Sequence, residues 1–448
     1  MTTRRTTWRV VTLGLVAAVS LAGCETFQDI ISSEDTKKLP GERISVMALE
    51  RKLEADPRLA SLEVILPRPY VNEGWPQPGG YADNAMHHLQ ASGSLDVLWS
   101  VNAGAGSSGS TELATAPVTA AGQVFVLDTE ATVYALNAVT GEETWSAELA
   151  PEDEDADEGR GGGVAFDGGK LFVTTGFGEA ISLDAATGAI IWRSALGTPF
   201  RAAPTVDGGR MFTITSDNQM ICLNIEDGSV LWRHRGIVES AGILAATSPA
   251  VSGSIVIVPY SSGELFALRV ENGNTLWSDS LTRTGNVTSL TELNDIAGRP
   301  VIDRGRVYAV SHSGRAVSID IRTGERVWTR NIAGTQTPWV AGGFIFVVTL
   351  DAEVVALSRR DGRIRWIQQL ERFEDEEDRD GPIEWSGPIL AGDRLVLLSS
   401  LGEAVSLSPY TGEQLGRIEL PDAVFVPPIM ANETLFVLTD DARLVALK

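Results

Sequence analysis

Short apolar runs recur along the chain from about residue 115 to its end. Each is four or five residues long, is rich in β-branched and aromatic residues, and is followed by a polar or glycine-containing break, as in 123–127, 132–136, 255–258 and 344–348. That composition and length are typical of β-strands. Few of the runs alternate between apolar and polar residues, and strands that are packed on both faces need not alternate. The pattern therefore predicts short strands that are buried on both sides.

An eleven-residue unit follows most groups of three runs, and its clearest copies span 135–145, 182–192 and 318–328. Each copy has a turn glycine followed four residues later by tryptophan. The glycines are Gly141, Gly188, Gly228, Gly273, Gly324, Gly362 and Gly412. The tryptophans are Trp145, Trp192, Trp232, Trp277, Trp328 and Trp366, and Gly416 takes that place in the seventh copy. Glycine supplies the positive φ that such a turn requires. Spacings of 38 to 51 residues between the glycines are typical of propeller blades.

Counting the units predicts the architecture. Three-strand sets start near residues 115, 163, 201, 247, 297, 338, 386 and 426, which gives eight blades, or seven if the set near 163 is misread. Only seven sets are followed by a fourth strand, whereas residues 96–101 carry the repeat tryptophan, Trp99, without three preceding strands. We expect an all-β, eight-bladed β-propeller of four-stranded antiparallel blades over residues 92–448. The strand at 96–101 is expected to complete the last blade.

The N-terminus has the pattern of a targeting segment. Three arginines occur within the first nine residues, an apolar stretch covers 10–21, and L-A-G-C ends at Cys24. The stretch is too short for a stable transmembrane helix. The tetrad resembles a bacterial lipobox, which implies a signal peptide at 1–23 and lipid on Cys24; an ordinary signal peptide is the alternative. Residue 25 is glutamate, not the aspartate that commonly signals retention in the inner membrane, so we expect a lipid anchor in the outer membrane, facing the periplasm. Residues 24–91 are expected to form a tether followed by a strap on the propeller.

Charge narrows the choice of partners. The formal net charge of −23 argues against binding to nucleic acid and to anionic lipid. Acidic residues are most concentrated in two runs, 152–158 and 374–380, each just after a predicted fourth strand. We expect both to be exposed loops between blades. Calcium binding is the alternative, but neither run has the spacing of a dedicated Ca²⁺ loop.

Candidate catalytic residues are few. The chain has two cysteines, and Cys222 occupies a repeat position that otherwise holds alanine or serine, so we expect a buried structural thiol. His87 and His88 lack metal-ligand spacing to other residues and are expected on the surface of the strap. The sequence has no G-x-S-x-G elbow, P-loop or H-E-x-x-H motif. We expect the repeat tryptophans to pack between blades, and we expect no catalytic residue, cofactor or metal.

The repeat unit resembles the tryptophan-docking repeat of pyrroloquinoline-quinone (PQQ) dehydrogenases, small-x-D-x-x-T-G-x-x-x-W. Two families share it: these enzymes, and BamB, a lipoprotein of the outer-membrane β-barrel assembly (Bam) machinery. Residues 287–300 resemble the BamB loop motif T-E-I-D-R-L-x-D-V-D-x-x-P. The enzymes usually add a vicinal cysteine pair, a Ca²⁺ ligand set and a longer chain, and this sequence has none of these. The resemblance to BamB covers essentially the whole region after the signal peptide.

The resemblance to BamB implies a scaffold that binds the POTRA domains of BamA and helps to deliver unfolded barrel precursors. The implied docking residues are Ile243, Leu244, Leu293 and Asp295. Leu244 replaces an arginine and Ala297 an aspartate of the family pattern, so the ion pairs of that docking mode are in doubt. Ordinary blade-connecting loops are the alternative interpretation of these segments.

Two other functions remain open at the level of sequence. A periplasmic PQQ-dependent dehydrogenase is compatible with the repeat. A propeller that binds cell-wall polysaccharide is compatible with exposed Trp339 and Trp385, although both residues lie near first strands, where packing in the core is equally natural.

Overall fold

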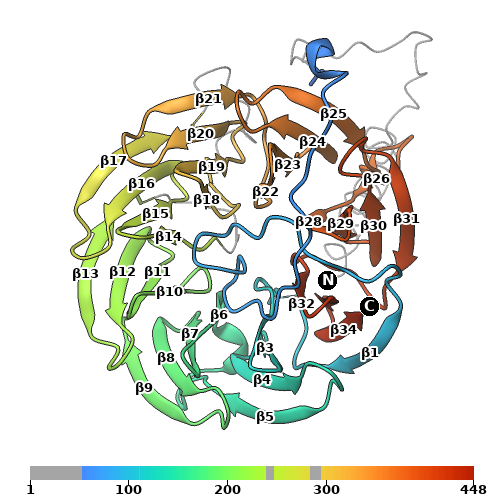
Figure 1. Ribbon diagram of the computed structural model, residues 1–448. Helices are drawn as coiled ribbons and strands as arrows, with labels where there is room; N and C mark the ends of the chain where they lie inside the picture. The colour runs from blue at the N-terminus through green and yellow to red at the C-terminus, as the bar shows by residue number, and fades with distance from the viewer. Residues whose placement is uncertain (1–52, 110, 239–246, 283–293) are drawn as a thin grey trace, which may run out of the picture. The chain divides into compact units, whose positions relative to one another are not determined.

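The computed structural model describes residues 53–109, 111–238, 247–282 and 294–448. In this part of the chain, eight four-stranded antiparallel sheets surround a common axis (Figure 1), so the prediction of an eight-bladed all-β propeller is confirmed. Two short 3-10 helices, η1 (Pro57–Leu59) and η2 (Ala156–Glu158), lie outside the sheets. None of the helices in the described ranges is long and apolar enough to cross a membrane.

The blades follow one another around the ring in chain order, and the strands of the first seven blades also follow chain order, from the axis outward (Figure 1). The first four blades are β2 (Val118–Ala120), β3 (Gln123–Leu127), β4 (Thr132–Asn137) and β5 (Glu143–Glu148); β6 (Gly162–Asp167), β7 (Lys170–Thr175), β8 (Glu179–Asp184) and β9 (Ile190–Ala195); β10 (Thr205–Asp207), β11 (Arg210–Ile214), β12 (Gln219–Asn224) and β13 (Val230–Arg235); β14 (Ala250–Ser252), β15 (Ile255–Pro259), β16 (Glu264–Arg269) and β17 (Thr275–Ser280). The next three are β18 (Val301–Asp303), β19 (Arg306–Val310), β20 (Ala316–Asp320) and β21 (Arg326–Arg330); β22 (Trp339–Ala341), β23 (Phe344–Val348), β24 (Glu353–Ser358) and β25 (Ile364–Gln369); β28 (Trp385–Ala391), β29 (Arg394–Ser399), β30 (Glu403–Leu407) and β31 (Gln414–Glu419).

The eighth blade combines strands from the two ends of the described chain. Its inner strands are β32 (Ile429–Ala431), β33 (Thr434–Leu438) and β34 (Arg443–Leu447), and its outer strand is β1 (Val97–Asn102). β1 runs antiparallel to β34, with Ser100 opposite Val445. Two backbone hydrogen bonds between Asp96 and Lys448, of 3.0 and 2.9 Å, extend the ladder. The strand that contains Trp99 therefore completes this blade.

The burial of the strands explains the hydrophobic pattern. Middle strands such as β23 and β24 are buried at every position, because neighbouring blades cover both of their faces. Outer strands such as β5 and β9 alternate between half-buried and exposed residues, since only one of their faces packs against a neighbour. The lack of alternation in the first three runs of each unit is therefore a consequence of stacking blades around an axis.

The repeat tryptophans pack between blades, as predicted. The indole Nε1 of each donates to a backbone carbonyl of the next blade at 2.7–3.1 Å; the pairs are Trp145–Ala185, Trp192–Ile225, Trp232–Val270, Trp277–Ile321, Trp328–Arg359 and Trp366–Pro409. The ring lies on the turn glycine of that next blade, where an added Cβ would come within 2.5–2.7 Å of it. Trp99 lies on Gly141 in the same way, but its buried Nε1 finds no hydrogen-bond acceptor among the described residues.

The acidic runs have different structures. Residues 152–158 form an irregular connection between β5 and β6 that includes η2. Residues 374–380, predicted to be an exposed loop between blades, are exposed and lie between β25 and β28, but they form most of a hairpin in which β26 (Phe373–Asp375) pairs with β27 (Asp380–Pro382). The Asp375 carboxylate orders its turn by accepting hydrogen bonds from the backbone N–H groups of Glu377 and Asp378. Within the part of the chain that the structure describes, no group of three or more His, Cys, Asp or Glu side chains is placed to hold a metal ion.

Residues 70–91, which we call the strap, cross the centre of the ring (Figure 1). They bond to the blades in their order around the axis, beginning with the eighth. The pairs are Asn72–Met430, Trp75–Thr119, Pro76–Phe166, Gln77–Val206, Ala82–Val251, Asn84–Pro300, His87–Trp339 and Leu89–Leu390. Each contact reaches the first strand of a blade, or the residue just before it, so the strap closes one end of the central channel.

His88 corrects a sequence prediction, because the structure buries it instead of leaving it on the surface of the strap. Its Nδ1 lies 2.8 Å from the carbonyl oxygen of Pro67, and its Nε2 lies 3.2 Å from the backbone nitrogen of Asp393. His87 remains partly exposed. The imidazole of His88 is thus used to join the strap to the seventh blade.

Candidate functional site

The predicted partner-binding residues belong to two connections between blades. Ile243 and Leu244 fall in 239–246, between β13 and β14, and Leu293 falls in 283–293, between β17 and β18; these three residues, like Cys24, lie outside the described residues. Asp295 is described, and so are the segments that flank both connections. These flanks define the geometry of the site.

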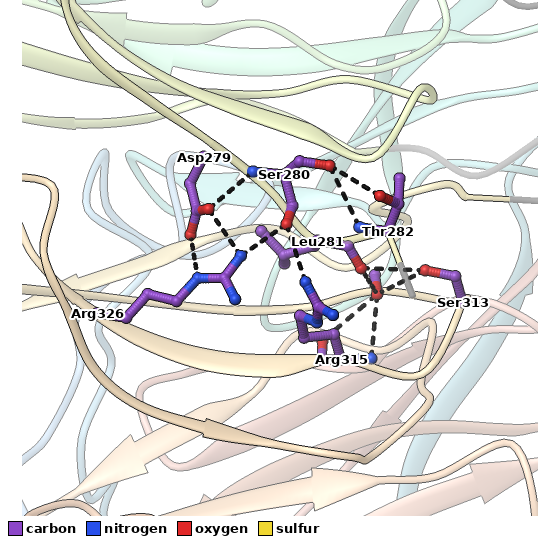
Figure 2. A network of polar contacts seen from close by, with 8 residues as sticks. Asp279, Ser280, Leu281, Thr282, Ser313, Arg315 and Arg326 are labelled. Carbon is purple, nitrogen blue, oxygen red and sulfur yellow. Dashed lines mark hydrogen bonds and ion pairs between the residues drawn. The ribbon is translucent and has the colours of Figure 1, made fainter. Parts of the chain in front are cut away.

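A polar network holds the start of the second connection (Figure 2). The Arg326 guanidinium donates to both carboxylate oxygens of Asp279 at 2.7 Å and to the Ser280 carbonyl at 2.6 Å. The hydroxyl of Ser313 donates to the Leu281 carbonyl at 3.1 Å, and Arg315 donates to the Ser280 carbonyl at 3.3 Å. Side chains of the fifth blade therefore fix the backbone of the fourth blade just before residue 283.

Asp295 holds the end of the same connection, and it does so from the interior. Its side chain is 1% exposed, and one carboxylate oxygen lies 2.8 Å from the Arg201 guanidinium. Arg201 lies just before the third blade and Asp295 just before the fifth. The ion pair therefore joins segments that belong to two blades that are not neighbours in the ring. The Asp295 carbonyl also accepts a hydrogen bond from the backbone of His312 at 2.9 Å. The structure therefore places Asp295 beneath the surface, two residues after the end of 283–293.

The first connection is bounded by one exposed and one buried segment. Ile237 and Val238, just before residue 239, are 59% and 57% exposed. On the other side, Thr247 and Ser248 are buried, and the Ser248 hydroxyl donates to the Ala203 carbonyl at 2.7 Å. Exposed aliphatic residues at the edge of a connection are suited to contact with another protein.

The central channel contains a cavity of about 740 Å³ above the strap. Trp339 and Trp385 line it, and both are buried, so neither is the exposed platform that a polysaccharide-binding surface would use. The Nε1 of Trp385 donates to the Glu371 carbonyl at 2.9 Å. Arg299 also lines the cavity, and burial lowers the pKa of its guanidinium to about 10. Sequence reasoning missed Arg299, because no local pattern distinguishes an arginine before a strand that faces the axis from one that faces solvent.

Cys222 lies away from the channel, within β12, and is completely buried as predicted. Burial raises the pKa of its thiol to about 12. A thiol held in the protonated form is a poor nucleophile.

A family profile described as outer membrane protein assembly factor BamB matches residues 88–154 and 152–368. Curated relatives of that name include the protein of Moranella endobia, which is 23% identical over 72% of this chain and 82% of its own length. The protein of Shewanella oneidensis is 24% identical over 80% of this chain and 90% of its own length.

Solved structures show the same fold. BamB from Moraxella catarrhalis superposes with a TM-score of 0.66 at 19% identity, covering 79% of this chain and 99% of that one. Quinohemoprotein alcohol dehydrogenase from Comamonas testosteroni superposes with a TM-score of 0.63 at 13% identity, covering 84% and 80%. The architecture is thus shared with enzymes, whereas the matching profile and the curated relatives carry the name BamB. The chain belongs to the family of outer membrane protein assembly factor BamB.

Proposed function

We propose that this protein is a non-enzymatic scaffold of the Bam machinery that binds the POTRA domains of BamA and assists the assembly of β-barrel proteins. In this proposal Cys24 carries the lipid that holds it to the outer membrane, on the periplasmic side. The observation that carries the proposal is how the described segments that flank residues 239–246 and 283–293 are held. These segments are tied to the framework and to each other, since the Thr247 hydroxyl donates to the Gly298 carbonyl at 3.4 Å. Loops presented by a rigid framework are suited to binding a partner.

The proposed roles of the predicted residues follow from where they lie. Ile243, Leu244 and Leu293 would supply apolar contacts to BamA, together with exposed Ile237. Asp295 would act through its ion pair with Arg201, because a carboxylate that is 1% exposed does not present itself to a partner. Asp295 is therefore proposed as a positioning residue of the docking face.

Affinity purification of the full lipoprotein from detergent-solubilised membranes tests the proposal, with BamA recovery as the measurement. We expect wild-type protein to retain BamA and Leu244→Glu to lose most of it. Leu415→Glu is the matched control, because Leu415 is an exposed aliphatic residue on the outer strand of the seventh blade. Absence of BamA from a clean wild-type purification, or equal loss with both variants, would contradict the proposal.

The ion pair permits a test of the positioning role. Asp295→Leu removes the carboxylate that pairs with the buried Arg201 guanidinium, and breaking a buried ion pair costs about 3–5 kcal/mol. We expect this variant to lose both unfolding free energy and BamA. Arg201→Met combined with Asp295→Leu replaces the pair by apolar groups and should restore both quantities. If stability returns without BamA, the carboxylate contacts the partner directly and the positioning role is wrong.

The shared fold with quinoprotein dehydrogenases calls for one further control. Purified protein is mixed with PQQ and Ca²⁺, and dye-linked oxidation of alcohols is measured. We expect no activity above that of the protein-free mixture.

A further inference from the structure

The central channel contains a buried cation, Arg299, which is 6% exposed and lines the cavity. Its Nε is buried, and the described residues provide neither a hydrogen-bond acceptor to this atom nor an ion pair to the guanidinium. Its backbone N–H is satisfied by Thr337, so the local fold accounts for the main chain but not for the charged group. Leaving a charge buried and unpaired costs several kcal/mol, which an anion bound beside it would offset.

The strap makes the channel blind at one end, close to this arginine. The side-chain amide of Asn84 donates at 2.8 Å to the carbonyl of Pro300, the residue after Arg299. Pro78 and Gly79 of the strap also line the cavity. A polypeptide therefore cannot thread through the channel, whereas a chain end, a side chain or a small anion can approach the guanidinium. A carboxyl end suits it, because arginine binds carboxylates through two parallel hydrogen bonds, whereas an amino end would be repelled.

Aromatic and aliphatic side chains form part of the channel wall, beside polar residues that include Glu112, Glu384 and Asp440. Trp75 of the strap stacks on Trp339 of the sixth blade, with ring centroids 6.3 Å apart and planes at 23°. Trp385 and Phe425 line the same cavity, and Phe425 is 40% exposed. Such walls bury an apolar side chain favourably, at roughly 25 cal/mol per Å² of apolar surface. The cavity of about 740 Å³ has the size of a site for one or two residues of a chain end.

We propose that the channel binds the carboxyl-terminal end of an unfolded polypeptide, with the terminal carboxylate on Arg299 and an apolar last residue against Trp339 and Trp385. The inference deepens the proposed function, on which it rests for the source of such chain ends, namely precursors that await assembly. It does not depend on docking to BamA, because Arg299, Trp339 and Trp385 are not among the residues proposed to contact BamA.

Fluorescence anisotropy with the full lipoprotein in detergent tests the site. The probe is a ten-residue peptide of alternating apolar and polar residues, labelled at its amino end and ending in a phenylalanine carboxylate. We expect binding that weakens at least tenfold when the carboxylate is converted to an amide. Arg299→Gln should cause a similar loss, and the amidated peptide should bind the variant and the wild-type protein alike. Arg322→Gln, on an exposed turn, is the matched control and should leave the affinity unchanged.

A stability measurement distinguishes the site from a structural role. Because Arg299 has no ion-pair partner among the described residues to lose, Arg299→Gln should leave the thermal midpoint unchanged or raise it. Equal binding of the acid and amide peptides would overturn the proposal, as would a lower midpoint with unaltered affinity. Benzoate that displaces the labelled peptide as effectively as unlabelled peptide does would also overturn the proposal, because the site would then be a pocket for small carboxylates. Absence of peptide binding by wild-type protein that still retains BamA would locate the failure in this inference and leave the proposed function standing.

Discussion

The repeat position that Cys222 occupies requires a small side chain, because two aromatic rings meet across it. Cys222 lies opposite Phe212 on one neighbouring strand and opposite Trp232 on the other, and the two ring centroids are 6.1 Å apart. Alanine or serine fills the equivalent position in the other blades that carry the unit. A thiol is the largest group in this series and behaves as a small apolar residue. The reactivity of the Cys222 thiol is therefore governed by its burial.

Cys222 is expected to resist alkylation until the protein unfolds. Burial raises the pKa of its thiol to about 12, so only about one molecule in ten thousand carries the thiolate at pH 8. An exposed thiol ionises to about one quarter at that pH. Iodoacetamide followed by mass spectrometry of the peptide that contains Cys222 should show negligible modification of native protein and complete modification in 8 M urea. Rapid modification of the native protein would contradict the burial of this thiol.

At the scale of the strand and turn, the repeat joins each blade to the next. A tryptophan on the outer strand of one blade lies on the turn glycine of the following blade and donates to a carbonyl beside that turn. The seventh blade has Gly416 in place of tryptophan, and the eighth blade explains why. Its third and fourth strands, β34 and β1, come from distant parts of the sequence, so no glycine turn joins them to receive a ring.

Comparison of two tryptophans measures the contribution of the indole hydrogen bond. Trp232→Phe removes the donor to the Val270 carbonyl, at 2.9 Å, and leaves that oxygen without this partner. Trp99→Phe removes no such hydrogen bond, because the Nε1 of Trp99 donates to none of the described residues. We expect Trp232→Phe to lower the free energy of unfolding by about 1–2 kcal/mol more than Trp99→Phe does. Urea titration followed by circular dichroism provides the values. Equal costs would mean that packing alone joins the blades.

At the scale of the whole molecule, the sequence predicts the blades but not the contacts between residues that are far apart in the chain. The blades could be predicted because each repeat is a local pattern, and the composition of the last blade followed from one orphan tryptophan. The contacts of the strap could not be predicted, since Asn84 and its acceptor on Pro300 are 216 residues apart. The burial of Asp295 likewise depends on Arg201, 94 residues away. A motif identifies such residues without showing whether they face the partner or the core.

The strap bonds to every blade and so spans the junction between the first and the eighth. We therefore predict that its contacts help to keep the ring closed. Three of its buried amides, on Asn72, Gln77 and Asn84, donate to carbonyls of the eighth, third and fifth blades at 2.7–2.8 Å. Replacing all three by alanine leaves those carbonyls unpaired, at about 1–3 kcal/mol each, and the effects should add because the sites are far apart.

We expect the triple variant to keep its β-sheet circular dichroism, to melt at a lower temperature, and to be cleaved within 70–91 by a protease that spares the wild type. Gln90→Ala is the control, because Gln90 makes an exposed contact with Glu433 and a surface change of this kind costs less than about 0.5 kcal/mol. If the triple variant melts with the control, the ring is closed by β1 alone and the strap only covers it. A lower melting temperature for the triple variant alone would make the strap a second closure of the propeller, independent of the strand pairing between β1 and β34.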